Sequence, residues 1–348
     1  MKLHIFNPEH DLVLAANKLP FTPSHSVRQL KSDLGFIPVF LANNGDAVLV
    51  DNVEATYTKL KHFKLQLPDV QFVTSDNLPD LAQQVDSISC WGIDNAICSD
   101  LRKYGFDKCL PSQSQLSAIR EMSSRRWVGA NLLPELCNLN VNYAQAYQEV
   151  TKFLKFYGRM VVKAPWSSSG RGVRYITSAL LDLSTQNWIK HIIAQQGGIM
   201  IEPFYHKIAD FGMEFTCDGK GNVQYCGLSI FNTKKAAYTG NQITSEDEKL
   251  RMLASYVNDA DLRSIRNSII QLMGPFTRQT YKGYFGVDMM VYYDEDSSKC
   301  LINPCVELNL RQTMGHVALA LYKEGEYSNH VMHIYYSSNG YHMSIMQK

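Results

Sequence analysis

Two apolar segments that flank a short polar turn constrain the fold of this chain more than any other feature. The segments cover Tyr284–Tyr293 and Lys299–Leu310, and the turn between them, 294–298, reads DEDSS. This pattern predicts an antiparallel β-hairpin. Asp288 lies nearly as far before the turn as Glu307 lies after it, so we expect the two carboxylates to face each other across the ladder.

The face that carries Glu307 also carries groups suited to a metal and a phosphate. Glu307, Asn309 and Arg311 alternate along one predicted strand and therefore share a face. Their neighbours are mostly apolar, and burying a carboxylate there is costly without a compensating charge or hydrogen bond. Such oxygen ligands suit Mg²⁺ that is held partly by phosphate and water, and Arg311 could touch the same phosphate. The alternative is a hairpin with an internal ion pair to Arg311.

A lysine in an apolar strand, followed by a Ser/Gly loop, forms a second motif. Lys163 lies in the segment Met160–Ala164, and the loop PWSSSGRGV follows at once. Lysine is rarely buried without an anionic partner, and a small flexible loop can direct several N–H groups and hydroxyls at phosphate oxygens. The order of residues is not that of a Walker A loop, and an ordinary turn uses the same residues. The candidate loop residues are Ser167, Ser168, Ser169, Gly170 and Gly172.

The first third of the chain alternates short apolar strands with helical segments. This alternation predicts a parallel, doubly wound α/β unit, in which ligands bind beyond the carboxyl ends of the strands. The loops Asn7–Asp11 and Trp91–Asp94 are therefore candidate substrate loops, although His10 and Asp11 would serve equally well as turn and helix-cap residues. Further along, the patterns predict a strand at Ile37–Leu41, helices at Ser114–Leu133 and Tyr143–Tyr157, and a loop at Thr233–Thr244. The tail, Gly315–Lys348, has a predicted helix at about His316–Tyr322, and its Tyr- and His-rich end has no assigned role.

Composition excludes some classes of function. The 348 residues are enough for two or three domains, and a net charge of +1 without a basic block argues against nucleic acid as a partner. No apolar run is long enough to cross a membrane, so we expect no membrane association. The eight cysteines include no C-x-x-C pair, which favours free thiols in a reducing cytoplasm.

Taken together, three blocks resemble the ATP-grasp superfamily: VVKAPWSSSGRGV, IMIEPF and FGVDMMV with VELNLRQTMG. The resemblance covers roughly residues 115–320. It implies an ATP-grasp fold of mixed α/β and α+β class, preceded by a doubly wound, Rossmann-like α/β domain. The expected domains are 1–115, then a small ATP-grasp subdomain at 116–203, then a large subdomain at 204–348.

The resemblance also implies roles for individual residues. Lys163 is similar to the lysine that holds the α- and β-phosphates of ATP, and the loop 167–172 to the segment that covers them. An earlier lysine is expected before Lys163; the nearest residues are Arg125 and Arg126, of which Arg126 is the candidate. The remaining implied roles are adenine recognition by Glu202 to Phe204, ribose contact by Glu214, Mg²⁺ ligation by Asp288, Glu307 and Asn309, and contact with the transferred phosphate by Arg311. At position 288 an Asp replaces the commoner Glu.

The function that the resemblance implies is an ATP- and Mg²⁺-dependent ligase. Such an enzyme converts a small-molecule carboxylate into an acyl-phosphate, which an amine or a thiol then attacks. Two alternatives share the nucleotide half of the site: a small-molecule kinase, in which a hydroxyl accepts the phosphate, and a non-catalytic nucleotide-binding protein. Which acceptor stimulates ADP release distinguishes them.

Overall fold

The computed structural model describes residues 1–348 except 168, 169, 171, 179, 235, 236, 324–326 and 348. The chain opens with a parallel sheet in the strand order β3-β2-β1-β4, which confirms the predicted doubly wound unit. Its strands are β1 (Lys2–Ile5), β2 (Ala47–Leu49), β3 (Gln71–Val73) and β4 (Ser87–Cys90). Its helices are α1 (His10–Ala16), α2 (His25–Leu34), α3 (Val53–Leu60), α4 (Leu78–Leu81) and α5 (Asn95–Lys103), with short 3₁₀ turns η2 (Ser75–Asn77) and η3 (Asp107–Cys109).

The segment Ile37–Leu41 is a 3₁₀ helix, η1, and not the predicted strand. Pro38 occupies its first turn. Proline has no N–H to donate to a ladder, and it is well tolerated where a helix begins. Ile37, Pro38 and Val39 of η1 are buried, and a short run of buried apolar residues gives the same pattern as a buried strand.

The predicted helix over Ser114–Leu133 divides into three. These are α6 (Gln113–Met122), α7 (Arg125–Asn131) and α8 (Leu133–Leu136). Ser124 caps α7 by accepting a hydrogen bond from the backbone N–H of Trp127, which is the usual role of serine at a helix N-terminus. The break turns the chain so that Arg125 begins a new helix.

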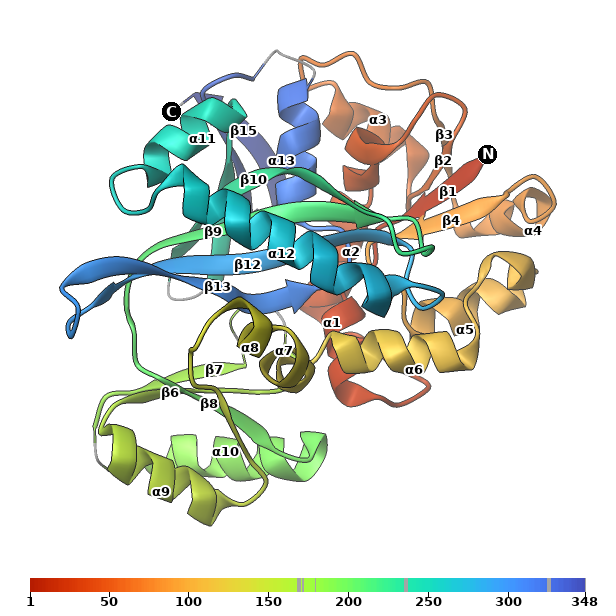
Figure 1. Cartoon of the computed structure of the whole chain (residues 1–348). Coiled ribbons are helices and arrows are strands. Elements are labelled where there is room, and N and C mark those ends of the chain that lie inside the picture. Colours follow the sequence, from red (N-terminus) through yellow and green to blue (C-terminus); the bar gives the residue numbers. More distant parts are fainter. Residues whose placement is uncertain (168–169, 171, 179, 235–236, 324–326, 348) are drawn as a thin grey trace.

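A small antiparallel sheet in the order β5-β8-β6-β7 follows, with two helices packed on it. Its strands are β5 (Asn142–Ala144), β6 (Met160–Lys163), β7 (Val173–Ile176) and β8 (Ile199–Pro203), and its helices are α9 (Tyr147–Tyr157) and α10 (Leu183–Gln196). The first residues of the predicted helix Tyr143–Tyr157 belong to β5 or to the loop after it. Figure 1 shows this layer below the rest of the molecule, with α7 and α8 between it and the large sheet.

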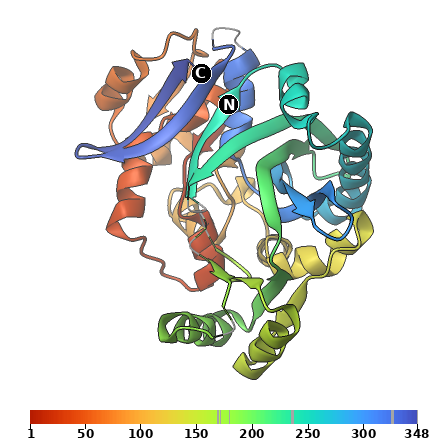
Figure 2. The same cartoon turned by 90° about the vertical axis from the view of Figure 1, so that its left-hand side faces the viewer.

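The large antiparallel sheet runs in the order β13-β12-β9-β10-β11-β14-β15. Its strands are β9 (His206–Cys217), β10 (Val223–Lys234), β11 (Ala237–Ile243), β12 (Gly283–Asp294), β13 (Lys299–Asn309), β14 (His330–Ser337) and β15 (Gly340–Gln347), and its helices are α11 (Glu246–Leu253), α12 (Asp259–Thr277) and α13 (Met314–Lys323). The predicted loop at Thr233–Thr244 is largely strand: 233 and 234 end β10, and β11 begins at Ala237. The unassigned tail forms a hairpin. Figure 2 shows the curvature of this sheet.

The two faces of the large sheet differ in character. Phe211, Phe215 and Phe285 are fully buried on one face, in a core shared with Ile269 and Met273 of α12. Because side chains alternate along a strand, the opposite face carries Glu214 and Asp288. That face is the one that holds the candidate site.

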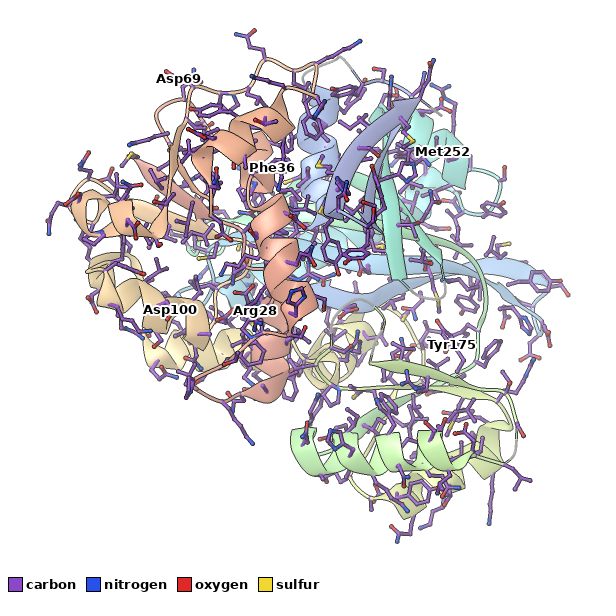
Figure 3. All side chains as sticks on the ribbon, turned by 180° about the vertical axis from the view of Figure 1, so that it is seen from behind. Arg28, Phe36, Asp69, Asp100, Tyr175 and Met252 are labelled. Atoms are coloured by element: carbon purple, nitrogen blue, oxygen red, sulfur yellow. The ribbon has the colours of Figure 1, made fainter. Side chains whose placement is uncertain are left out.

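The last hairpin packs on the first domain. One buried cluster joins Phe36 and Trp91 near the start of the chain to Val317, Leu321 and Met332 near its end. Figure 3 shows the end of the chain beside α2, the helix on which Arg28 lies. Within the described residues, no helix is both long and apolar enough to cross a membrane.

Candidate active site

The hairpin β12–β13 brings its two acids opposite each other. Asp288 pairs with Glu307 in the ladder, which confirms the predicted register. The register shifts between 288 and 290, so that Met290 pairs with Asn303. Pro304 lies in this irregular segment, where a residue without an N–H costs no ladder bond. The bulge absorbs the extra residues of β13 and keeps the two acids aligned.

Asn309 and Arg311 continue the site beyond this pair. The Asn309 side-chain amide donates to Asp288 at 3.0 Å, and Arg311 donates through Nη2 to Asn309 Oδ1 at 2.8 Å. The Nε of Arg311 lies 3.1 Å from a carboxylate oxygen of Asp11, in the first turn of α1. A residue 300 positions away therefore fixes the arginine. Asp11 was predicted only as a turn, cap or substrate-loop residue.

The acids on this face repel one another. Burial, and then the charges of Glu307 and Glu214, raise the pKa of Asp288 to about 8. Burial also raises the pKa of Glu214 to about 7, although a hydrogen bond from Thr313 opposes the shift. Burial acts to lower the pKa of Arg311, but Asp11 more than offsets this and raises it. The site therefore favours added positive charge.

Arg125 joins the residues that follow β6 to this hairpin. Its Nη2 lies 2.8 Å from Glu307 Oε1, and its Nη1 donates to the backbone oxygen of Ala164 at 2.8 Å and to Ser167 Oγ at 2.7 Å. Arg126, the predicted contact, is exposed and lies over the ring of Tyr143 instead. Arg125 is buried and its neighbour is exposed because successive residues of a helix face different directions. The role of either arginine beside a nucleotide stays a prediction.

Lys163 has the anionic partner that its burial requires. Its ammonium lies 2.6 Å from Glu202 Oε2, and the two side chains are 8% and 9% exposed. Phe204 follows at the end of β8, with the guanidinium of Arg159 5.1 Å from the centre of its ring. Lys163 and Glu202, which are both predicted to contact the nucleotide, are therefore adjacent.

The remaining predicted residues are placed as follows. In the Ser/Gly loop, Ser167, Gly170 and Gly172 are described, and Gly172 accepts a backbone hydrogen bond from Ala164; Ser168 and Ser169 lie outside the described residues. Glu214 is 3% exposed and points at the loop before α13, where Thr313 donates to it at 2.8 Å. Its role beside a ribose stays a prediction.

Several solved structures share the fold of this chain. The N5-carboxyaminoimidazole synthetase of Staphylococcus aureus, complexed with ADP, superposes with a TM-score of 0.53 and 14% identity, covering 96% of this chain and 82% of that one. Biotin carboxylase of Campylobacter jejuni gives a TM-score of 0.55 at 13% identity, covering 92% and 67%. A putative ATP-grasp superfamily protein of Archaeoglobus fulgidus gives 0.50 at 12% identity, covering 100% and 99%. The chain has the ATP-grasp fold. No protein-family model and no curated protein matches the sequence.

The predicted metal site can be compared with the donors that the structure brings together. No group of three or more His, Cys, Asp or Glu side chains capable of holding a metal occurs in the described part of the chain. The predicted set contains two acids and an amide, Asp288, Glu307 and Asn309, and these oxygens suit Mg²⁺ when phosphates and water supply further ligands. The raised pKa of Asp288 marks a place where a cation would relieve repulsion.

Proposed function

We propose that this protein is an ATP-dependent ligase that activates a small-molecule carboxylate as an acyl-phosphate and joins it to an amine or a thiol. The observation that carries the proposal is the arrangement of Asp288, Glu307 and Asn309 on the hairpin, with Arg311 bound to Asn309 just beyond its end. Arg125 links that face to the strand that carries Lys163. Three charged elements far apart in the sequence thus converge where two subdomains meet.

The known structures support the same reaction class. Those with this fold include a synthetase complexed with ADP and a carboxylase domain in complex with MgADP and bicarbonate. At 11–14% identity they share the fold alone. We infer that Asp288, Glu307 and Asn309 hold Mg²⁺, which when bound neutralises charge on the triphosphate.

The reaction has two steps, in which the chain's own residues bind and position the phosphates. A carboxylate oxygen of the substrate attacks the γ-phosphorus, the bond to the β–γ bridging oxygen breaks, and ADP leaves. The nucleophile then attacks the acyl carbon, inorganic phosphate leaves with the bonding electrons, and the nucleophile loses its proton. Lys163 binds the phosphates that are not transferred, and Arg311 contacts the phosphoryl group that moves. Positioning and charge neutralisation account for most catalysis of this kind.

Hydroxylamine trapping tests the proposal. The protein is incubated with ATP, Mg²⁺, hydroxylamine and a panel of small mono- and dicarboxylic acids and amino acids. An acyl-phosphate yields a hydroxamate in step with ADP, and the Glu307→Gln variant yields none. A stable phosphate ester formed with an alcohol alone would make the protein a kinase instead. Failure of the wild-type protein to bind ATP in calorimetry would refute the whole nucleotide assignment.

A further inference from the structure

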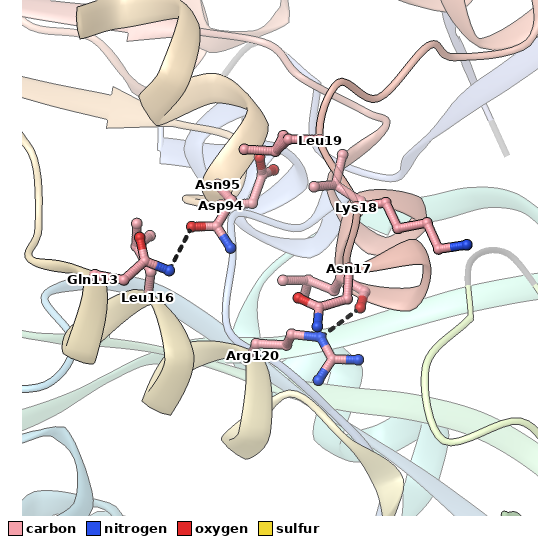
Figure 4. A pocket seen from close by; sticks show the side chains of 10 residues that line it. Asn17, Lys18, Leu19, Asp94, Asn95, Gln113, Leu116 and Arg120 are labelled. Carbon is pink, nitrogen blue, oxygen red and sulfur yellow. Dashed lines mark hydrogen bonds between the residues drawn. The ribbon is translucent and has the colours of Figure 1, made fainter. Parts of the chain in front are cut away.

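A second cavity lies between the helices α1 and α5 beside the parallel sheet and the helix α6, outside the predicted phosphate site. Its volume is about 290 Å³, room for on the order of ten water-sized groups. It opens between the end of α1, the start of α5 and the length of α6 (Figure 4). In the order β3-β2-β1-β4, the strands β2 and β3 lie on one side of β1 and β4 lies on the other. The cavity lies beyond the carboxyl ends of β1 and β4, where doubly wound folds bind ligands.

Arg120 is the notable group in this cavity. Its Nε donates to the backbone oxygen of Leu14 at 2.8 Å, and its guanidinium carbon lies 3.9 Å from the centre of the Trp166 ring. No carboxylate within ion-pair distance of Arg120 is found among the described residues, whereas Arg125 pairs with Glu307 and Arg311 with Asp11. Partial burial lowers the pKa of Arg120. A partly buried cation without an anion is costly, so it marks a place for a ligand.

The acid that lines the cavity does not neutralise this arginine. Asp94 accepts from the backbone N–H groups of Ala96 and Ile97 through Oδ1. Its Oδ2 lies 2.9 Å from His10 Nδ1 and accepts from the Asn7 amide. Both oxygens are therefore committed to holding α1 and α5 in place.

The other walls can donate hydrogen bonds to an anion. Asn95 and Gln113 line the cavity and contact each other at 3.2 Å, and Lys18 adds a second positive charge at its exposed rim. Leu14 and Leu116 supply apolar surface. The lining thus combines two cations and side-chain amides with a small apolar patch.

We infer that this cavity binds a carboxylate of one reactant that is not itself phosphorylated, and that Arg120 is the residue that recognises it. Because Nε of Arg120 is occupied, the Nη1 and Nη2 groups remain, and such paired N–H groups match the two oxygens of a carboxylate. Leu14 also lines the small cavity beside Glu307 and Asn309, so the two sites adjoin. The inference rests on the proposed function. One carboxylate is phosphorylated and another binds Arg120, so the reactants are small acids that together carry at least two carboxylates.

Calorimetry on the full chain tests this. The protein is saturated with a non-hydrolysable ATP analogue and Mg²⁺, and then titrated with succinate, glutarate or glutamate, and with neutral succinamide. We expect at least one of the acids to bind, succinamide not to bind, and Arg120→Gln to weaken acid binding by about 10–100-fold, the range for one charge-assisted pair. Affinity for the ATP analogue should not change.

Two further variants keep the test decisive. Asn95→Asp places a carboxylate at the first position of α5, where a helix tolerates acids, and should block acid binding without disturbing the fold. Arg266→Gln removes a partly buried arginine that lies over Tyr225, away from the cavity, and should leave acid binding unchanged. Absence of binding by all three acids, or equal binding by wild type and Arg120→Gln, would overturn the inference. If the ATP analogue itself fails to bind, the proposed function fails instead.

Discussion

Replacing Asp288 by Asn should stabilise the nucleotide-free protein while abolishing turnover. Asn keeps the size of the side chain and an oxygen that accepts from Asn309, but it removes a charge that burial disfavours and that Glu307 and Glu214 repel. Function and stability therefore conflict at this position, as they often do where an active site holds like charges together.

The structure sets the magnitude and the sign of this effect. The pKa of Asp288 rises from 3.8 to about 8, and each tenfold change in acid dissociation is worth about 1.4 kcal/mol, so the ceiling is about 6 kcal/mol. Partial solvent contact of the side chain reduces it, and we expect about 2–3 kcal/mol. Between these two pKa values the native carboxyl keeps its proton and the unfolded one loses it. Wild-type stability therefore falls as pH rises from about 4 to about 8.

Urea unfolding of both proteins at about pH 5 and at about pH 8.5, without nucleotide, measures the difference in free energy. The gain from Asp288→Asn should be small at the lower pH and largest at the higher one. Asp210→Asn is the control, because Asp210 lies in the neighbouring strand but pairs with Lys207 at 2.6 Å, and its loss should stabilise at neither pH. A gain that is equal at both pH values, or a loss at about pH 8.5, would show that the charge of Asp288 is not the cause.

Three other predictions concern the same region. Glu307→Gln should fold and still bind ATP but lose turnover, and wild-type turnover at saturating Mg²⁺ would contradict the metal assignment. Lys163→Met should chiefly weaken ATP binding in calorimetry, by about 10–100-fold. Arg311→Met should bind ATP nearly normally and turn over about 10²–10³-fold more slowly. If Arg311→Met instead lost affinity at an unchanged rate, Arg311 would be a structural partner of Asp11. Gly92→Ala should destabilise the fold by about 1–3 kcal/mol in urea unfolding, because a Cβ at 92 would overlap the His10 ring, and unchanged stability would show that the ring moves freely.

The parts of the site that follow from local alternation could be predicted from the sequence. The pairing of Asp288 with Glu307 depends on side-chain period and on distance from a turn, both of which are visible in one short segment. The need of Lys163 for an anionic partner follows from its burial in an apolar strand. The identity of that partner, Glu202, required the pairing of β6 with β8.

Contacts between distant segments could not be predicted. The pair of Asp11 and Arg311 spans 300 positions, and nothing local distinguishes Asp11 from a helix-terminal acid. The choice between Arg125 and Arg126 depended on where α7 begins, and helix boundaries depend on capping and packing together. The strand β11 was missed because its sequence, AYTGNQI, is mostly polar and contains a glycine, as loops usually do.

The cluster shared by the two ends of the chain bears on how the protein is made. Asp33 accepts a hydrogen bond from the backbone of Tyr341, 308 residues later. At about 5–20 residues per second on the ribosome, roughly 15–60 seconds separate the synthesis of these partners. During that interval Phe36 and Trp91 lack the apolar cover that Val317 and Met332 later provide. The first domain is thus a nascent-chain segment with an unfinished core, and chaperones that hold exposed apolar surface would find their target there.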